Sequence, residues 1–350
     1  MSCKPSQAPV RRNIKELGPG EKIDDQVFLI ARKDLRSSNN GSLYIHIVLA
    51  DRTGQLLGRI WQATEAQYQQ IPEGGFLRIR GRTESYKGQL QFIIDGMQAV
   101  EAGAVNPADF VPHSPFDIDQ MWQRTLAILR TVKSRHLLLL LKKFVEDERI
   151  ISKFKRSPAA VNMHHAYVGG LIEHTLSLLE LASLIFGRED DSTSRYPNVS
   201  RDLILTGIFL HDIGKAWELG FDTAFKYTDG GQLVGHIVQA AIWIDRKCGE
   251  VEEDTKEPFP EDLQAALTHI VLAHHGTYEF GSPRLPATPE AIAVHHLDNL
   301  DAKLQQFTHA IDGETDETTN WTDYINSLST RIYKKDVLGV RKRAAEKGRP

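Results

Sequence analysis

Alternating apolar and polar positions mark the first third of the chain as β-structure. Residues 43–49 place four aliphatic side chains on one face and Tyr44, His46 and Val48 on the other, which is typical of a strand with one buried face. Further strands are predicted at 23–30, 55–61, 76–82 and 89–94, with a short helix at 62–70. Five strands with a helix between the third and the fourth follow the order of an OB-fold barrel.

The rest of the chain has a helical period. Residues 103–116 are rich in Ala, Gly, Pro and Ser and are predicted to form a linker. Helices are expected from Asp117 to about residue 310, and a final helix at 321–333. We therefore predict a multidomain chain with these parts: an N-terminal extension (1–21), an all-β OB-fold domain (22–102), the linker (103–116), a helical connector (117–160), an all-α bundle (161–312), and a C-terminal helix with a basic tail (313–350).

Composition narrows the class of protein. The chain has 350 residues, which is enough for two domains with ordinary cores. Cys3 and Cys248 are its two cysteines, so a disulfide framework and a cysteine-based zinc site are not expected. The first 20 residues lack the apolar segment of a signal peptide, and no run reaches the ~18 apolar residues of a membrane span. We expect a cytoplasmic protein without membrane contact.

Charge is unevenly distributed along the chain. The net charge is −4, but residues 1–105 carry +3 and residues 331–350 carry +6, whereas residues 106–330 carry −13. An acidic centre suits divalent cations and basic ends suit a polyanion. A basic tail of this kind is as often a solvated, disordered arm, so the tail alone does not decide between these roles.

Candidate chemistry begins where the apolar run 203–210 ends in His211 and Asp212. Buried ionisable groups are costly without partners, and a metal ion is the natural partner of such a pair. Gly214 is expected to end this helix. Ten of the 14 histidines lie between residues 164 and 296, so further ligands are close in the sequence.

These further candidates fall on apolar faces or at the ends of predicted helices. His174 has Leu171 and Leu178 at the i−3 and i+4 positions, on one helix face. A single histidine in such a place is more often a core residue than a ligand. Several histidines together with two aspartates favour a metal site. The candidates are His174, His211, Asp212, His236, His274, His275 and Asp298.

The type of ligand restricts the metal. Imidazole and carboxylate together suit Mn, Fe, Zn, Ni or Co. The set is too rich in nitrogen for a site specific to magnesium or calcium. The absence of cysteine from the set disfavours a structural zinc site.

Five strings of residues carry a resemblance to a known family. They are HHAYVGGLIEH at 164–174, FLHDIGK at 209–215, HIVLAHHG at 269–276, GSP at 281–283 and LDNLDAK at 297–303. The order of His174, His211-Asp212 and Asp298 resembles the signature of HD-domain phosphohydrolases. The five strings together resemble YhaM-type 3′-to-5′ exoribonucleases, which place an OB-fold in front of an HD domain. The resemblance covers residues from about 20 to 310.

The resemblance implies a site with two metals, for which Mn²⁺ is the favoured ion. One metal would be held by His174, His211, Asp212 and Asp298. Asp212 would bridge to a second metal held by His236, His274 and His275. Two metals about 3.5–4 Å apart can activate a hydroxide and clamp a phosphodiester, and attack at the 3′ end would release nucleoside 5′-monophosphates.

Some roles stay open on sequence alone. Lys215 follows the pair closely enough to contact a phosphate oxygen, but a solvated lysine at a helix end is an equal alternative. Asp301 competes with Asp298 as a ligand, and His295 is a candidate to orient Asp298. His164, His165 and His269 are either orienting groups or substrate contacts.

The predicted barrel offers candidates for contact with a single strand. OB-folds bind such strands with stacked aromatic rings and a basic groove. The candidates are Tyr44, His46, Arg59, Trp61, Arg78, Arg80, Tyr86 and Lys87. Trp61 has core packing as an equally good alternative. A balance of only +3 over this part of the chain predicts modest, salt-sensitive affinity.

Three functions are consistent with these observations. The first is a metal-dependent 3′-to-5′ exonuclease acting on single-stranded RNA, with single-stranded DNA as a second substrate. The second is an HD phosphohydrolase of a small nucleotide, such as a cyclic dinucleotide. His275 is followed by Gly276, Thr277 and Tyr278, not by the Glu and Gly-Tyr-Pro motif of the best-known dinucleotide class. The third is a non-enzymatic nucleic-acid-binding factor. The sequence leaves homo-oligomerisation open.

Overall fold

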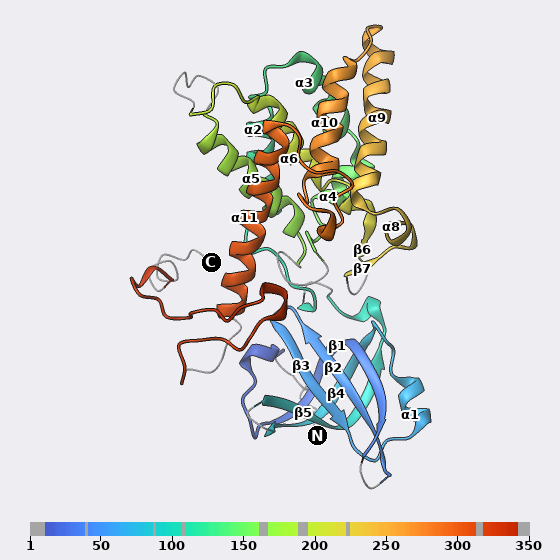
Figure 1. Ribbon diagram of the computed structural model, residues 1–350. Helices are drawn as coiled ribbons and strands as arrows, with labels where there is room; N and C mark the ends of the chain where they lie inside the picture. The colour runs from blue at the N-terminus through green and yellow to red at the C-terminus, as the bar shows by residue number, and fades with distance from the viewer. Residues whose placement is uncertain are drawn as a thin grey trace, which may run out of the picture. The chain divides into compact units, whose positions relative to one another are not determined.

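The chain folds into two compact units, residues 1–113 with 221–225, and residues 114–220 with 226–350. The computed structural model describes residues 11–38, 41–86, 89–106, 109–160, 167–187, 195–221, 225–312 and 318–341. Figure 1 shows the first unit as a closed β-barrel and the second as a bundle of helices. The predicted fold class, an all-β OB-fold barrel followed by an all-α bundle, is confirmed.

The barrel has five strands, which are β1 (Lys22–Ser37), β2 (Leu43–Asp51), β3 (Gly54–Ile60), β4 (Phe76–Tyr86) and β5 (Gln89–Val100). They are hydrogen-bonded in the order β1-β2-β3-β5-β4, and β1 pairs with β4 to close the sheet. Helix α1 (Glu65–Gln70) lies between β3 and β4 in the sequence. β3 and β5 pair in parallel while the other neighbours are antiparallel.

The alternation of β2 produces the barrel core. Ile45, Ile47 and Leu49 are fully buried, while Tyr44 and His46 are only half-buried on the other face. Phe28 and Phe92 meet edge to face inside the barrel, with ring centroids 6.3 Å apart. Each fully buried aliphatic or aromatic side chain stabilises the fold by about 1.5–3 kcal/mol relative to exposure.

Segments flanking the barrel also pack against it. In the predicted N-terminal extension, Ile14 is buried and its N–H donates to Asp51 Oδ2 at 2.6 Å. In the predicted linker, the Phe110 ring lies 4.7 Å from that of Phe76, and both are buried. Apolar side chains therefore hold parts of both segments on the barrel, although their composition is typical of loops.

The second unit is built around α6 (Arg201–His211), whose residues from Ile204 onward are all buried. It packs against α5 (Gly170–Ile185), α10 (Glu261–Ala273) and α11 (Pro289–Asp312), as Figure 1 shows. The other helices are α2 (Ile118–Leu129), α3 (Arg135–Val145), α4 (Glu148–Phe154), α7 (Lys215–Glu218), α8 (Asp229–Val234) and α9 (His236–Thr255), and the short strands are β6 (Leu219–Phe221) and β7 (Phe225–Tyr227). No helix in the described ranges is both long and apolar enough to cross a membrane.

Two local predictions are wrong. The predicted final helix at 321–333 is a looped segment, in which Trp321 bridges to Tyr333 and their ring centroids lie 5.2 Å apart. Its apolar residues have helical spacing, but Thr322 and its Asn, Ser and Thr neighbours are weak helix formers that compete for backbone bonds. The second error concerns Gly214, which does not end α6, because α6 ends at His211.

Gly214 instead permits a close approach between two segments. A Cβ at this position would lie 2.1 Å from the backbone oxygen of His236. A side chain here would therefore push the start of α9 away from the His211-Asp212 turn.

Candidate metal centre and nucleic-acid interface

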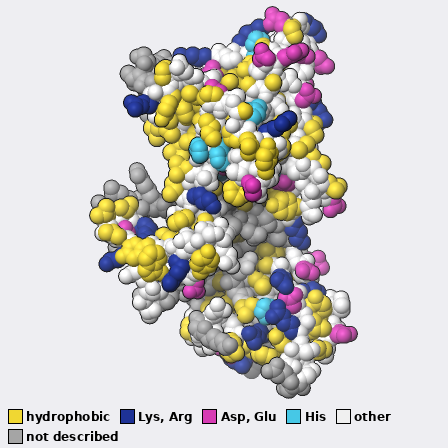
Figure 2. Space-filling view, in the orientation of Figure 1, with side chains coloured by type: hydrophobic (Ala, Val, Ile, Leu, Met, Phe, Trp, Pro, Cys, Tyr) yellow, Lys and Arg dark blue, Asp and Glu magenta, His cyan; other side chains and the backbone are white. Residues whose placement is uncertain are grey.

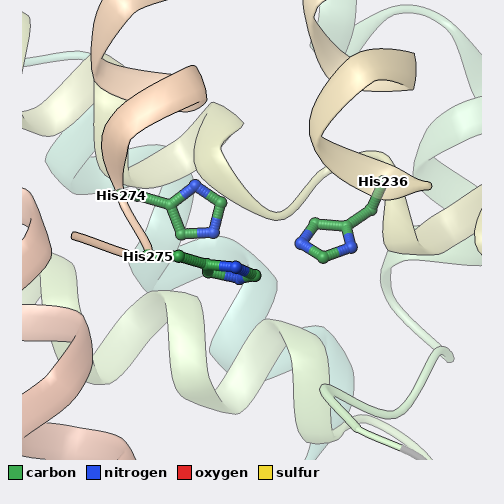
Figure 3. Close-up of side chains that lie close together, drawn as sticks. All are labelled: His236, His274 and His275. Atoms are coloured by element: carbon green, nitrogen blue, oxygen red, sulfur yellow. The ribbon is translucent and has the colours of Figure 1, made fainter. Parts of the chain in front are cut away.

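The ends of successive helices bring the predicted ligands together. His211 is the last residue of α6, and Asp212 caps that helix. His236 begins α9, and His274 caps the end of α10. Figure 3 shows His274 and His275 at the end of one helix facing His236 at the start of another. Polar residues are tolerated here because helix ends leave backbone groups that these side chains can bind.

Asp212 lies between two groups of ligand atoms. Its Oδ2 is 3.3 Å from His211 Nε2 and 4.0 Å from His174 Nε2. Its Oδ1 is 3.4 Å from His236 Nε2 and 3.5 Å from His274 Nε2. One carboxylate therefore presents one oxygen to each group.

The two groups each offer three further ligand atoms. His174, His211 and Asp298 form one, and His236, His274 and His275 form the other. Within each group the ligand atoms lie within 4.8 Å of one another. Asp298 Oδ1 is 3.2 Å from His174 Nε2. All the sequence-predicted metal ligands are thus within reach of one site.

Backbone carbonyls fix the orientation of three of these rings. The Nδ1 of His211 donates to Ile208 O at 2.6 Å and the Nδ1 of His274 donates to Val271 O at 2.7 Å. The Nδ1 of His275 donates to Phe280 O at 2.7 Å. A carbonyl oxygen only accepts, so Nδ1 carries the proton and Nε2 keeps its lone pair for a metal.

Carboxylates orient the other two rings. His236 Nδ1 lies 3.0 Å from Glu218 Oε2, and His174 Nδ1 lies 2.8 Å from Asp301 Oδ2. Ser177 Oγ donates to Asp301 Oδ1 at 2.6 Å. A carboxylate on the second ring nitrogen is the usual support of a metal-bound histidine. This geometry favours Asp298 as the ligand and Asp301 as the residue that orients His174.

Unpaired buried atoms test whether a metal fits these residues. Within the described ranges His211 Nε2, Asp212 Oδ1, His236 Nε2 and His274 Nε2 are buried without a hydrogen-bond partner. Leaving such an atom unsatisfied costs about 1–3 kcal/mol. Four of them converging at one place is explained by a ligand that accepts several lone pairs. Nitrogen and oxygen donors of this type suit a first-row divalent ion.

Burial controls the charge of the second group of histidines. It lowers the pKa of His236, of His274 and of His275, and that of His275 falls to about 4 with a further contribution from His274. These rings are therefore neutral near pH 7. A neutral ring is the form that binds a metal.

Asp212 and His174 keep their charges against the effect of burial. Burial opposes the anion of Asp212, but the ammonium group of Lys215 outweighs it and holds the pKa of Asp212 well below its usual value. Burial likewise opposes the cation of His174, but Asp298 and Asp301 raise the pKa of His174 to about 10. A metal at His174 Nε2 would replace a proton, so binding there should release one.

A cavity of about 360 Å³ opens onto the ligands. Lys215 lies at its wall with Nζ 2.7 Å from Asp212 Oδ2, and its side chain is 14% exposed. On another wall α11 presents Asn299, Lys303 and Gln306. A cation that remains partly accessible beside the ligands can contact a phosphate oxygen.

The remaining histidines of the family-like strings are elsewhere. His295 Nδ1 donates to His274 O at 2.8 Å, so it supports the turn after α10 and does not orient Asp298 as the sequence suggested. His269 Nε2 accepts from Ala287 N at 2.9 Å. His164 and His165 lie outside the described residues.

Sequence reasoning missed Glu218. It is 8% exposed, and its Oε1 also accepts the backbone N–H of His236 at 3.0 Å. The signal was weak, namely a glutamate between Trp217 and Leu219 in a short apolar stretch. His236 lies eighteen positions further along the chain, and no periodic pattern links the two residues.

The outer face of the barrel gathers the predicted aromatic contacts around one arginine. The guanidinium of Arg59 lies 5.4 Å from the ring centroids of Trp61 and Tyr86 and 6.0 Å from that of Tyr44. The rings of Tyr44 and Trp61 are 5.2 Å apart. Trp61 is 46% exposed and Tyr86 50% exposed, so neither is a core residue. We call these four residues the Arg59 cluster.

The other predicted contacts are less available. His46 lies 3.9 Å from Asp34, and burial followed by Arg36 and Arg59 lowers the pKa of His46. Arg78 pairs with Asp25 at 2.5 Å. Arg80 is exposed on the same strand, and Lys87 lies outside the described residues. Figure 2 shows dark-blue Lys and Arg side chains together with a histidine on the visible face of the barrel.

Comparisons with known proteins give one family match and several likenesses to solved structures. Residues 171–303 match the family model described as HD domain. A domain of replication protein A from Methanococcus maripaludis is 18% identical, with 26% of this chain and 97% of that chain covered and a TM-score of 0.23. The single-stranded DNA binding protein from Thermus aquaticus is also 18% identical, with 23% and 40% covered and a TM-score of 0.21.

At these TM-scores the likenesses carry no argument, and the assignment of the barrel rests on its own strand order. The family match spans His174, the His211-Asp212 pair and Asp298. The chain therefore has a match to the HD domain at residues 171–303, and an OB-fold barrel precedes it.

Proposed function

We propose that this protein is a metal-dependent 3′-to-5′ exonuclease that hydrolyses single-stranded RNA, and also single-stranded DNA, to nucleoside 5′-monophosphates. The observation that carries a polymeric substrate is the Arg59 cluster, which combines exposed rings with a cation on the barrel surface. Stacking on such rings is tolerant of base sequence and is worth about 1–3 kcal/mol per base. The hydrolysis of a small nucleotide would not require such a surface on the barrel.

Two divalent ions would activate water as Lewis acids and neutralise charge on the phosphodiester. Mn²⁺ is the favoured ion. The residues that would hold them are His174, His211, Asp212 and Asp298 for one, and Asp212, His236, His274 and His275 for the other. Asp301 and Glu218 keep two of these rings in place.

The remaining groups of the cavity position the phosphodiester. Lys215 and Lys303 both line it, and their ammonium groups would bind non-bridging oxygens. Hydrolysis adds the oxygen of water to phosphorus and breaks the bond to the 3′ oxygen of the preceding nucleotide. The water protons are shared between the new phosphate and the released 3′ hydroxyl.

The size of the cavity supports a second candidate function. A volume of about 360 Å³ within one unit is at the lower end of the range for sites that enclose a small ligand. A phosphohydrolase of a small nucleotide would need no further surface. A third function, that of a binding factor without activity, leaves the four unpaired buried atoms unexplained.

One experiment separates these functions. Purified protein with Mn²⁺ is incubated with a 5′-labelled single-stranded RNA and, separately, with cyclic dinucleotides. A ladder that shortens from the 3′ end supports the exonuclease, and addition of EDTA should stop it. Cleavage of the dinucleotide alone supports the second function. Binding of the strand without cleavage under Mn²⁺, Co²⁺, Ni²⁺, Zn²⁺ or Fe²⁺ supports the third.

A further inference from the structure

Two aromatic residues line the cavity beside the second group of ligands. Tyr227 is the last residue of β7, and Phe280 ends the short turn that follows His275. Both come from segments that orient a histidine ligand. Phe280 O accepts from His275 Nδ1 at 2.7 Å. The residue after Tyr227, Thr228, donates its N–H to the backbone of Glu218, which holds His236.

These contacts tie the backbone segments that carry the two rings to the groups that orient the ligands. A residue whose own carbonyl bonds a ligand ring cannot move far without moving that ligand. The backbone of Phe280 is therefore tied directly to His275, and that of Tyr227 is tied to His236 through Thr228 and Glu218. The exposed fraction is 65% for Phe280 and 49% for Tyr227, so a large part of each residue is open to solvent.

Rings left this exposed in a cavity need an explanation. Exposed apolar surface that gathers in a concave site typically marks the place of a ligand. The cavity wall formed by α11 is different in kind, because Asn299, Lys303 and Gln306 follow one another at spacings of four and three on one helix face. The cavity therefore has an aromatic part and a polar, basic part.

A nucleotide has the same division, with a flat base and a polar sugar-phosphate. We propose that Tyr227 and Phe280 form a subsite that stacks on the base of the nucleotide whose phosphate lies at the ligands, while the α11 residues face its sugar-phosphate. This inference rests on the proposed phosphodiester hydrolysis and does not depend on whether the substrate is a strand or a small nucleotide. Stacking reads the face that all bases share, so the subsite selects nucleotides without selecting a base.

The test compares ligands with and without a base. The Mn²⁺-loaded protein is titrated calorimetrically with adenosine 5′-monophosphate and with ribose 5-phosphate. Stacking of one base predicts that the nucleotide binds about 5–150-fold more tightly. Phe280→Ala and Tyr227→Ala should each reduce this ratio about 5-fold or more, with the affinity for ribose 5-phosphate unchanged.

Matched variants distinguish stacking from damage to the site. Tyr278 lies in the same turn as Phe280 and is 61% exposed, but it does not line the cavity. Tyr278→Ala should keep the wild-type ratio, and Phe280→Tyr and Tyr227→Phe should keep most of it. Phe280→Leu retains apolar volume without an aromatic face and should fall with the alanine variant. If one alanine variant binds ribose 5-phosphate more weakly than the wild type does, its substitution has damaged the phosphate site. The ratio measured for the other alanine variant then decides.

The inference is overturned if the wild-type protein binds both ligands equally, or if both alanine variants keep the preference. These outcomes are separate from failure of the exonuclease. A preference for the nucleotide without shortening of RNA leaves the subsite standing and removes the strand as substrate. Shortening of RNA without a preference for the nucleotide leaves the exonuclease standing and removes the subsite.

Discussion

The carboxylate of Glu218 binds His236 twice, once through the backbone N–H and once through the ring. Glu218 Oε1 accepts the backbone N–H at 3.0 Å, and Nδ1 lies 3.0 Å from Oε2. One side chain therefore sets both the start of α9 and the orientation of the ring. The lone pair of His236 Nε2 is directed toward Asp212 as a result.

Glu218→Gln should weaken metal binding without unfolding the protein. Loss of a carboxylate that supports a ligand typically lowers metal affinity or activity about 10–100-fold. Activity at limiting Mn²⁺ should fall by this factor and recover at high Mn²⁺. Glu279→Gln is the control, because Glu279 is exposed near the site and binds none of the ligands by any described contact. Equal behaviour of the two variants would contradict the role of Glu218.

Asp212→Ala should abolish hydrolysis and leave strand binding nearly intact. The carboxylate is the residue that both ligand groups share, whereas the Arg59 cluster belongs to the barrel. Hydrolysis is followed with a 5′-labelled RNA and binding with a fluorescent RNA of the same sequence. Loss of binding together with hydrolysis would show that the two units do not divide these tasks.

Gly276 and Gly281 form a natural pair for a test of stability. Both have φ of +80°, a conformation that costs a residue with a side chain about 1–2 kcal/mol. At Gly281 an added Cβ meets nothing within 4 Å, whereas at Gly276 it lies 2.1 Å from Cε1 of His295. Gly281→Ala should cost the strain alone, and Gly276→Ala should cost more and also lower Mn²⁺ affinity.

Urea unfolding of the metal-free protein measures the first quantity and calorimetric titration with Mn²⁺ the second. The affinity should fall because the clash displaces the turn that carries His274 and His275. A Gly276→Ala variant as stable and as tightly metal-binding as Gly281→Ala would show that His295 moves aside freely.

Arg59→Ala should weaken strand binding and reduce its dependence on salt. If its guanidinium contacts one phosphate, the slope of log affinity against log salt should become less steep by about 0.7. Arg82 is the matched control on the same barrel, since it is paired with Asp95 at 3.5 Å. Fluorescence anisotropy from 50 to 300 mM salt measures both. An equal or larger effect of Arg82→Ala would contradict the role of Arg59, because Arg82 lies on the same face of the barrel, with β5 between the two residues.

Asp147 makes the stability of the helical unit sensitive to acid. Hydrogen bonds from Arg149 lower the pKa of Asp147, burial opposes them, and Lys247 adds to the lowering, so that the pKa is about 2 instead of 3.8. A pKa depressed in the folded state means that this stabilisation is complete above the unfolded value and is lost as the pH falls from about 4 to 2.

Asp147→Asn should therefore destabilise the protein at pH 7 by about 1–3 kcal/mol, because Lys247 loses a buried partner. The difference from the wild type should shrink as the pH falls through this range. Asp254→Asn is the comparison, since Asp254 pairs with Lys143 at an exposed position, where such a pair contributes about 0–1 kcal/mol. Urea unfolding at several pH values measures both, and a difference independent of pH would exclude the ionised carboxylate as the cause.

Much of the architecture was predictable because its patterns are local. The alternation in β2 and the apolar run of α6 each appear within about ten residues, and each element buries the face that its pattern indicates. The His211-Asp212 pair was visible for the same reason, because two ionisable residues interrupt a buried helix. Competition between Asp298 and Asp301 needed the structure, since both lie on α11 and both contact His174.

What escaped prediction depends on contacts between distant segments. A hydrogen bond joins Glu218 to His236, eighteen positions further along the chain, and the close approach of His236 leaves no space for a side chain at Gly214. In the segment 321–333 the spacing of apolar residues predicted a helix, but Thr322 exchanges hydrogen bonds with Ile332 instead. The spacing of apolar residues shows which side chains would share one face of a helix. It does not show which other groups form hydrogen bonds with the backbone of the segment.

The ligands belong to five helices or helix ends, from His174 near the start of α5 to Asp298 within α11. An ion bound to them would tie together segments that are far apart in the chain, and would act on the fold as a cross-link. Binding to the folded form alone adds about 2.7 kcal/mol of stability when the free ion is at 100 times its dissociation constant. A shortage of the metal would then make the protein more susceptible to proteases as well as inactive. Its abundance would therefore follow the supply of the ion.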